Sequence, residues 1–345
     1  MEQRLNEIWY GGVVQATPVL RSLAWLYGVV VRLRNKAYTA RWLNSYRVGK
    51  PVVVVGNVTV GGTGKTPLVA WLAAELARRG LRVGIVSRGY GRSYDTPHLV
   101  QPDSNWRDVG DEPLLLRCRT GCLTIVGRDR VAAARALVAH GVDVIIADDG
   151  LQHLRLRRDC EIVVVDGARG FGNGRLLPAG PLRETVSRLL RVDVTVVNGP
   201  AEHSSLRYMR LQPAARCMTM SMAGASARRL DDTSCERSLE QFRGERVHAV
   251  AGIGNPARFF RDLREHGIDV IEHAFADHHP YEAHELDFDD GLAVLMTEKD
   301  AVKCRQFSAP RLWYVPITAH FDDAQRHELL RCVLRTTGLA GRTGE

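Results

Sequence analysis

The sequence lacks an apolar run long enough to cross a membrane. Its longest run, Leu23 to Val31, falls well short of the ~20 residues that a spanning helix needs. A secretory signal peptide is also missing, because Glu2 and Glu7 stand where a positive region belongs and no clear small-residue cleavage site follows. We therefore expect neither a membrane-spanning helix nor a cleaved leader.

Closely spaced cysteines are scarce as well. The chain has seven cysteines, an odd number, and only Cys118 and Cys122 form a close pair. Neither a second pair nor a nearby histidine cluster completes a zinc site. Internal repeats and low-complexity tracts are also absent. The cysteine pattern is typical of reduced thiols in a cytosolic protein.

The composition indicates a folded chain with an uneven charge distribution. The 345 residues are 45% hydrophobic and 25% charged, which suits a soluble globular protein of about two domains. The formal net charge is +8, yet residues 1–50 carry eight Lys or Arg against Glu2 and Glu7. A basic segment predicts an acidic partner, such as nucleic acid, anionic lipid or a phosphorylated substrate.

The same N-terminal segment is rich in aromatic and aliphatic residues. Trp25 and Tyr27 lie in its apolar run, and Arg21 and Arg32 flank that run. Aromatic residues beside Arg and Lys are typical of an element lying in the membrane interface. A helix packed on the protein's own core is the alternative. Nucleic acid is disfavoured, because bulky aliphatics interrupt the basic residues.

From residue 51 onward, apolar strands alternate with helical patterns, which predicts a mainly parallel sheet covered on both faces. The expected strands are Val52–Val55, Val83–Ser87, Leu123–Val126, Val144–Ala147, Ile162–Val165 and Val194–Val197, with helices at Pro67–Arg79, Asp111–Arg117, Arg128–His140 and Arg183–Leu190.

A second α/β series follows a polar connection over residues 200–245, which is expected to carry one edge strand at Met218–Met222. Its expected strands are Val247–Ala251, Ile268–Ile271, Ala293–Met296 and Leu312–Val315, and a helix from Asp322 to Arg335 ends it. The sequence thus predicts a helical, membrane-associating segment over residues 1–50, an α/β core over 51–210 and a smaller α/β lobe over 211–345.

The stretch from Val60 to Pro67 resembles a phosphate-binding loop between a strand and a helix. Thr59 replaces the first glycine of the usual pattern, but the remaining glycines still let backbone N–H groups turn around a phosphate. The alternative is a tight turn with an incidental lysine. The expected nucleotide-binding residues are Thr59, Val60, Gly61, Gly62, Thr63, Gly64, Lys65 and Thr66.

An acidic strand end provides a candidate magnesium site. Asp148 and Asp149 follow a buried strand, at the edge where ligands bind in open α/β sheets. Adjacent buried acids are unfavourable unless a cation compensates them. With Thr66 as a further ligand they would hold Mg²⁺; a surface turn closing on Gly150 is the alternative.

Two further stretches favour a kinase over a binding switch. Asp111 stands at an expected helix start, where it is either a helix cap or the group that deprotonates an acceptor hydroxyl. His278 and His279 follow Asp277 in the second series and suit an active-site loop, although an ordinary polar turn stays open.

Together these stretches closely resemble the tetraacyldisaccharide 4′-kinase family of Gram-negative bacteria. The motifs run in order over residues 51–303 and are specific as a set. They are GNVTVGGTGKTP (56–67), SRGYGR (87–92), VGDEP (109–113), ADDGLQ (147–152), LPAGPLRE (177–184), GIGNP (252–256), Asp277-His278 and TEKD (297–300).

The resemblance implies a P-loop kinase core, a second lobe that closes over the nucleotide, and ATP with Mg²⁺. The substrate would be a tetraacylated glucosamine disaccharide 1-phosphate, phosphorylated at its 4′-hydroxyl to give lipid IVA. The protein would lie peripherally on the cytoplasmic face of the inner membrane, held there by the N-terminal segment, with no nucleic acid partner.

The resemblance also implies residue roles. Lys65 would stabilise charge on the transferred phosphate, Asp111 would be the base, and His278, preferred over His279, would assist Asp111. Asp148 and Asp149 would hold the metal and its waters. Arg88, Arg183 and Glu184 would be substrate-side residues, and Thr297–Asp300 would contribute to the second lobe's part of the nucleotide cleft.

Two other functions fit parts of the pattern. A membrane-associated P-loop ATPase switch would share the loop and the N-terminal segment, but Val60 stands where that class has a signature lysine. A P-loop kinase or ligase of a soluble metabolite would not need the basic, aromatic N-terminus.

Overall fold

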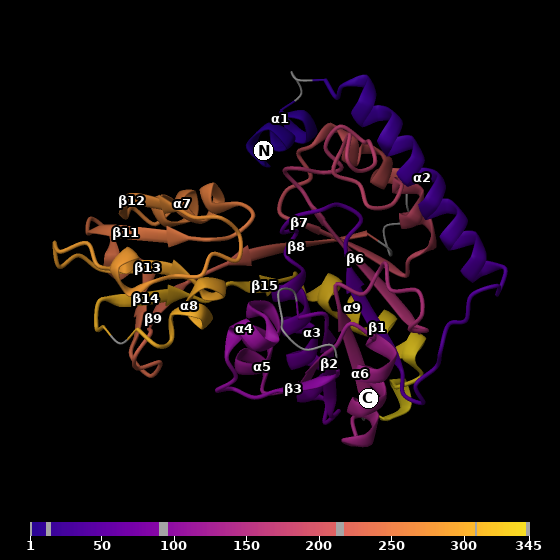
Figure 1. Ribbon diagram of the computed structural model, residues 1–345. Helices are drawn as coiled ribbons and strands as arrows, with labels where there is room; N and C mark the ends of the chain where they lie inside the picture. The colour runs from indigo at the N-terminus through magenta and orange to yellow at the C-terminus, as the bar shows by residue number, and fades with distance from the viewer. Residues whose placement is uncertain (1, 12–14, 90–95, 212–216, 308, 343–345) are drawn as a thin grey trace.

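The computed structural model describes residues 2–11, 15–89, 96–211, 217–307 and 309–342. They form two α/β lobes lying side by side, with the helical N-terminal segment along the outer edge of the larger lobe (Figure 1). The expected fold class, a P-loop core with a smaller second α/β lobe, is confirmed.

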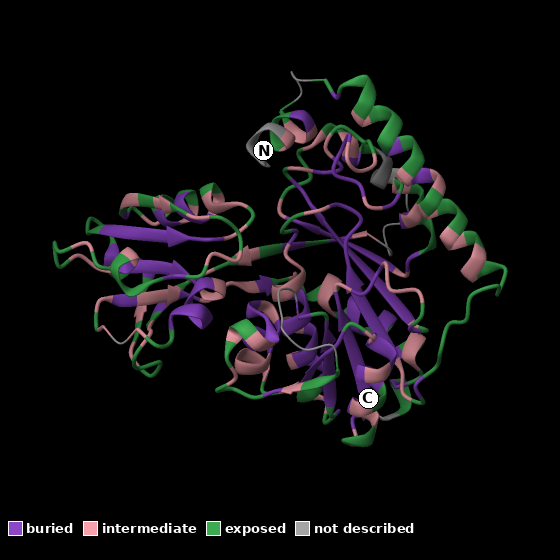
Figure 2. Ribbon diagram, viewed as in Figure 1, coloured by how far each residue is buried: buried purple, intermediate pink, exposed green. Residues whose placement is uncertain are grey.

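The larger lobe, here called the core lobe, is built on a nine-stranded sheet. Its strand order is β15-β8-β7-β6-β1-β5-β2-β4-β3, parallel except for the outermost strands β3 and β15. The central strands are buried along their whole length, because helices or long connections cover both faces (Figure 2). The bounds are β1 Val52–Gly56, β2 Val83–Ser87, β3 His98–Val100, β4 Leu123–Val126, β5 Val144–Asp148, β6 Cys160–Asp166, β7 Val194–Asn198, β8 Cys217–Ala223 and β15 Thr318–His320.

Amphipathic helices cover the two faces of this sheet. On one face, α3 (Lys65–Arg78) and α9 (Asp323–Thr337) insert leucines against β1, β5 and β6. On the other, α6 (Arg130–Ala139) packs with residues 151–206, which include the 3-10 helix η1 (Val186–Arg191) and the start of η2 (Ser204–Leu211). Two helices beside the sheet, α4 (Trp106–Val109) and α5 (Asp111–Thr120), face the second lobe (Figure 1). The carboxyl ends of the parallel strands therefore meet between the lobes.

The second lobe is a six-stranded sheet of order β10-β9-β14-β13-β11-β12. Helix α7 (Pro256–Glu265) covers one face and α8 (Glu298–Cys304) the other. The strands are β9 Ser226–Arg229, β10 Glu236–Ser238, β11 Arg246–Ala251, β12 Asp269–Ala274, β13 Val294–Thr297 and β14 Leu312–Val315, with short 3-10 helices η4 Leu239–Phe242 and η5 Ala283–Leu286; η6 (Ala340–Arg342) follows α9 in the core lobe.

The N-terminal segment forms α1 (Glu2–Tyr10) and α2 (Pro18–Thr39). Only Ala24 and Gly28 of α2 are buried, while Trp25 and Leu26 are 69% and 54% exposed. Among the residues described, no helix combines the length and the hydropathy needed to cross a bilayer. The segment is thus helical, as expected, and keeps a solvent-facing apolar surface.

Two local expectations differ from the structure. Met218–Met222 lies within β8, which is not an edge strand, because β7 and β15 pair on its two sides. The expected helix Arg183–Leu190 is a 3-10 helix that begins at Val186, since the N–H of Arg183 instead donates to the carbonyl of Val58 at 2.7 Å.

The sheets also divide the chain differently from the expected boundary at residues 210 and 211. β8, β15 and α9 follow that boundary in sequence but belong to the core lobe, because Leu329, Leu330 and Val333 of α9 pack against the central strands. The second lobe is therefore an insertion, spanning roughly β9 to β14, between β8 and β15.

Candidate active site

The phosphate loop links β1 to α3, which begins at Lys65. Gly64 has a φ of 94°, and a Cβ there would lie 2.7 Å from Nδ2 of Asn198, so only glycine fits. The same Nδ2 donates to the carbonyl of Thr63 at 3.1 Å and fixes the loop to the end of β7. A fixed glycine loop at a helix N-terminus is a binding site for phosphate.

The loop lines a cavity of about 550 Å³ between the lobes. Residues 61–67, Asp149 and Arg183 contribute from the core lobe, and Asp277, His278 and Lys299 from the second. This volume suits a small-molecule ligand the size of a nucleotide. The cavity therefore brings the loop together with the second-lobe histidine motif, which is more than two hundred residues away in sequence.

The two adjacent aspartates after β5 have different environments. Asp149 faces the cavity, 3.7 Å from Nζ of Lys65 and 3.1 Å from a guanidinium nitrogen of Arg183. Burial alone would raise the pKa of Asp149, but these two cations outweigh it and hold that pKa below its ordinary value. Asp148, the last residue of β5, is 1% exposed, and Ser87 donates to it at 3.4 Å.

Asp148 has unmet bonding capacity that fits a cation. Burial first, and the nearby Glu112 and Asp149 second, raise the pKa of Asp148 to about 7. Its Oδ1 is buried and has no hydrogen-bond partner, an unfavourable state that a bound cation would relieve. Within the described part of the chain, no cluster of three or more His, Cys, Asp or Glu could hold a metal. One or two carboxylates and Thr66 suit Mg²⁺, which takes its other ligands from phosphate and water.

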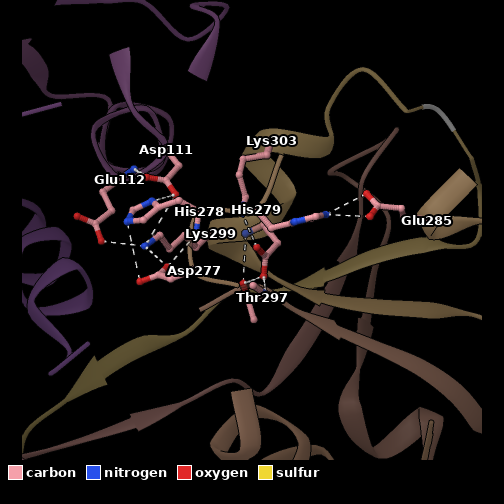
Figure 3. A network of polar contacts seen from close by, with 11 residues as sticks. Asp111, Glu112, Asp277, His278, His279, Glu285, Thr297, Lys299 and Lys303 are labelled. Carbon is pink, nitrogen blue, oxygen red and sulfur yellow. Dashed lines mark hydrogen bonds and ion pairs between the residues drawn. The ribbon is translucent and has the colours of Figure 1, made fainter. Parts of the chain in front are cut away.

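Asp111 and His278 meet across the two lobes (Figure 3). Nδ1 of His278 lies 2.7 Å from Oδ2 of Asp111, at the N-terminus of α5. Burial alone would raise the pKa of Asp111, but the His278 hydrogen bond and the charge of Lys299 lower it overall. That hydrogen bond is also the main reason why the pKa of His278 is raised. The pair is therefore an ionised carboxylate with a hydrogen-bonding imidazole, as a proton acceptor requires.

Several other predicted residues do not join the cavity or the Asp111–His278 pair. His279 does not reach Asp111, because its Nε2 contacts Glu285 at 2.9 Å. Glu184 is 2% exposed and accepts from Asn35 of α2 at 3.3 Å, so it does not line the interlobe cavity. Arg88 is exposed directly after β2 and is absent from the described cavity lining. Residues 90–92 of the same motif lie outside the described residues.

Some contributors to the cavity were not predicted individually. Asp166 ends β6 as Asp148 ends β5, and it lines the cavity. An acidic residue at the end of an apolar strand could have identified it from the sequence. Arg119 closes α5 and donates to Oε2 of Glu298 in the second lobe at 2.8 Å. Lys299 was expected only as part of a cleft motif, and its contacts with carboxylates of both lobes were not foreseen.

A phosphate loop whose cavity is also lined by a histidine bonded to a buried carboxylate defines a P-loop kinase, since a simple nucleotide switch needs no group to deprotonate an acceptor. The chain belongs to the tetraacyldisaccharide-1-P 4′-kinase family, whose model matches residues 16–335. The resemblance inferred from the motifs is confirmed, and the chain is an enzyme of the kinase class.

Similar proteins cover nearly the whole chain. It is 51% identical over 324 residues to the tetraacyldisaccharide 4′-kinase of Alkalilimnicola ehrlichii, with 94% of each chain covered. Identity to that of Methylobacillus flagellatus is 45% over 333 residues, covering 96% of each chain. A crystal structure of LpxK from Aquifex aeolicus in complex with ATP is 26% identical, with a TM-score of 0.76 over 92% of this chain and 98% of that one.

Proposed function

We propose that this protein transfers the γ-phosphoryl group of ATP to the 4′-hydroxyl of a tetraacylated glucosamine disaccharide 1-phosphate, which gives lipid IVA. The observation that carries the proposal is the meeting of His278 and Asp111 beside the cavity lined by the phosphate loop. The names of the family and of the related enzymes supply the acceptor.

In the proposed reaction, Asp111 accepts the proton of the 4′-hydroxyl as its oxygen bonds to the γ-phosphorus. The bond from that phosphorus to the β,γ-bridging oxygen breaks, and ADP leaves. The transition state is loose, so Lys65 and the loop amides act mainly by stabilising charge on the phosphoryl oxygens. Asp111 is 4% exposed, and its neighbours Glu112 and His278 line the cavity, so the acceptor would approach it from that cavity.

Mg²⁺ would be held by Thr66 and by Asp148 and Asp149 at the end of β5. The Oδ1 of Asp148 is buried without a hydrogen-bond partner, which supports this assignment. When bound, the ion neutralises charge on the β- and γ-phosphates. Lys65 lies 3.7 Å from Asp149, so the same carboxylate would serve both cations.

The exposed apolar surface of α2 supports a peripheral location on the inner membrane. The substrate's acyl chains lie in the bilayer, and ATP is available on the cytoplasmic side. Trp25 and Leu26 would enter the interface, while the basic residues of the segment, Arg21, Arg32 and Lys36, would contact anionic headgroups.

The decisive experiment is transfer of label from γ-labelled ATP to tetraacyldisaccharide 1-phosphate in mixed micelles, with Lys65→Ala as the control. Label on the lipid with the native protein, lost in the variant, is the expected result. Free phosphate without labelled lipid would overturn the proposal and indicate an ATPase switch. Labelling of a soluble sugar in preference to the lipid would overturn the acceptor assignment.

A further inference from the structure

Lys299 is a partly buried cation, 16% exposed at its side chain, and lies between carboxylates of both lobes (Figure 3). Its Nζ lies 3.1 Å from Oε1 of Glu112 and 3.8 Å from Oδ2 of Asp111, both on α5 of the core lobe. It also lies 3.0 Å from Oδ1 of Asp277 in the second lobe. Burial would lower the pKa of Lys299, but the three carboxylates raise it overall, so the side chain stays charged.

The position of Lys299 is unfavourable for its own helix. It is the second residue of α8, where the helix dipole opposes a positive charge. Thr297 and Asp300 form an N-terminal cap for α8: the Asp300 N–H donates to Oγ1 of Thr297 at 3.2 Å, and that hydroxyl donates back to Asp300 at 2.6 Å. Helix formation therefore does not explain a lysine here, whereas the three acids do.

A buried network fixes this end of α8 in the second lobe. Asp300 is fully buried, accepts the Gly252 N–H at 2.9 Å and pairs with the buried Lys303 at 2.8 Å. The backbone that carries Lys299 is thus rigidly placed. A rigid backbone limits the positions that the end of a long side chain can reach, so the contacts of Lys299 are well defined.

The contact continues from Lys299 to the base. The same Oδ1 of Asp277 that contacts Lys299 also accepts the backbone N–H of His278 at 3.1 Å. His278 has a φ of 63°, which a histidine adopts only when its surroundings hold it there. The chain of contacts therefore runs from Lys299 through Asp277 and His278 to Asp111.

We propose that Lys299 is a positioning residue for phosphoryl transfer: by bridging Glu112 and Asp277 across the lobes, it holds His278 in hydrogen-bonding contact with Asp111. This inference rests on the proposed function and extends it to the closing of the two lobes. Without Lys299, three carboxylates face one another with no cation between them, and the turn carrying His278 is free to relax away from Asp111.

The test compares Lys299→Met with Lys299→Arg, using steady-state transfer to the lipid over a range of pH. We expect Lys299→Met to lower kcat by about 100-fold, the scale of an impaired general base, with the KM for ATP changing less than about threefold. The acid limb of the kcat profile should move to higher pH, because a cation beside Asp111 is lost. Lys299→Arg keeps the charge and should recover most of kcat.

Arg305→Met is the matched control. Arg305 caps the other end of α8 and donates to the carbonyl of Pro102 in the core lobe at 2.9 Å, so it too joins the lobes, at the opposite end of α8 from Lys299. We expect this variant to keep kcat and its pH profile. Equal loss in both variants would mean that Lys299 acts only as a general link between lobes, which would overturn the inference.

Further outcomes separate the inference from the function it rests on. A raised KM for ATP in Lys299→Met with unchanged kcat and pH profile would make Lys299 a simple nucleotide contact and overturn the inference. If the native protein labels the lipid and Lys299→Met labels it equally well, the inference is overturned but the proposed function stands. Absence of labelling by the native protein would overturn both.

If Lys299→Met does not fold, as judged by its thermal unfolding, Glu112→Gln carries the same test. It removes the negative charge of the nearer core-lobe partner of Lys299 while keeping every other charge of the cluster. A lowered kcat with an unchanged KM for ATP is then expected. Unchanged kcat would overturn the inference.

Discussion

At the scale of single residues, the site concentrates backbone strain where the chemistry is proposed. Asp149 and His278 both adopt positive φ, 47° and 63°, which costs of order 1–3 kcal/mol for non-glycine residues. Ion pairs hold the first, and hydrogen bonds from the backbone N–H and Nδ1 of the histidine to the carboxylates of Asp277 and Asp111 hold the second. The strain sets the directions of one carboxylate and one imidazole that face the same cavity.

Replacing Asp111 should separate chemistry from binding. Asp111→Ala removes the proton acceptor but leaves the phosphate loop and its contacts intact. We expect kcat to fall by about 10²–10³ while ATP affinity changes little. Initial-rate kinetics together with calorimetric nucleotide titration check this. Unchanged turnover would rule out Asp111 as the base, and an equal loss of affinity would indicate a nucleotide contact.

The pH dependence of kcat should depend on His278. As the proposed base, Asp111 would act when deprotonated, and its hydrogen bond to His278 helps to hold its pKa below the ordinary carboxyl value. In His278→Gln the charged partner is lost, the pKa of Asp111 rises, and the acid limb of kcat should move to higher pH. A pH profile of native and variant enzyme measures the shift. An acid limb at the same pH in both would contradict the coupling.

The same pair also predicts that stability depends on pH. Its stabilising contribution is lost as the pH rises, whereas kcat is lost as the pH falls. The pKa of His278 is raised above its ordinary 6.5, mainly by the hydrogen bond to Asp111. Its contribution to folding is therefore complete below 6.5 and is lost as the pH rises through the raised value. Denaturant unfolding of native protein and His278→Gln should thus differ most on the acid side of neutrality, provided that Asp111 stays ionised.

At the scale of elements, sequence patterns identified the parts that depend on local chemistry. The valine-rich β1, the loop before Lys65 and the acidic end of β5 were all predicted, because burial on both faces and phosphate binding constrain neighbouring residues. The 3-10 helix η1 was misassigned, because a long-range bond from Arg183 to Val58 displaces the helix start.

Other elements could not be placed from the sequence, because their partners are distant in the chain. β8 has strand-like residues, but only pairing with β15, almost a hundred residues later, places it inside the core sheet. Likewise, nothing local to Lys299 shows that α5 will supply its carboxylates. His278 was preferred over His279 through a family resemblance, and the structure brings His278 to Asp111.

The exposed face of α2 gives a prediction at this scale. Trp25 and Leu26 contact solvent, so replacing both by Gln should change the free energy of unfolding by less than about 0.5 kcal/mol each. If α2 lies in the membrane interface, the double variant loses roughly 2–3 kcal/mol of apolar burial per residue and should bind vesicles far more weakly.

Sedimentation with vesicles containing anionic phospholipid measures this loss, with thermal unfolding as the control for folding. Phosphate transfer to a substrate dispersed in detergent should fall less than transfer to substrate in vesicles. Equal vesicle binding by native and variant protein would contradict an interfacial role for α2.

At the scale of the whole molecule, the second lobe joins the core lobe through two adjacent chain crossings. One lies between β8 and β9 and the other between β14 and β15. Arg119 of α5 binds the second crossing, donating to the carbonyl of Ile317 at 2.6 Å and to Oγ1 of Thr318 at 2.9 Å. The relation between the lobes, and with it the meeting of His278 and Asp111, therefore depends on how these crossings pack.

At Gly224 the two crossings pack closely. A Cβ on Gly224 would lie 2.5 Å from Cγ1 of Val315 and 3.3 Å from the carbonyl of Pro316, so the two crossings touch with no room for a side chain. Val315 is 3% exposed and stiff at χ1, so it cannot turn aside easily. Gly224→Ala should therefore destabilise the protein by about 1–3 kcal/mol and lower kcat, because the lobes are pushed out of register.

A double-mutant cycle distinguishes this contact from a general effect of the added methyl group. Val315→Ala makes room for the new Cβ, so the double variant should be less destabilised than the sum of the single variants, with part of kcat restored. Gly341→Ala, where a Cβ would have open space, is the control and should be close to neutral. Strict additivity in the cycle would mean that the crossings move independently, and the lobes would then have to be held by contacts at the site itself, Lys299 foremost.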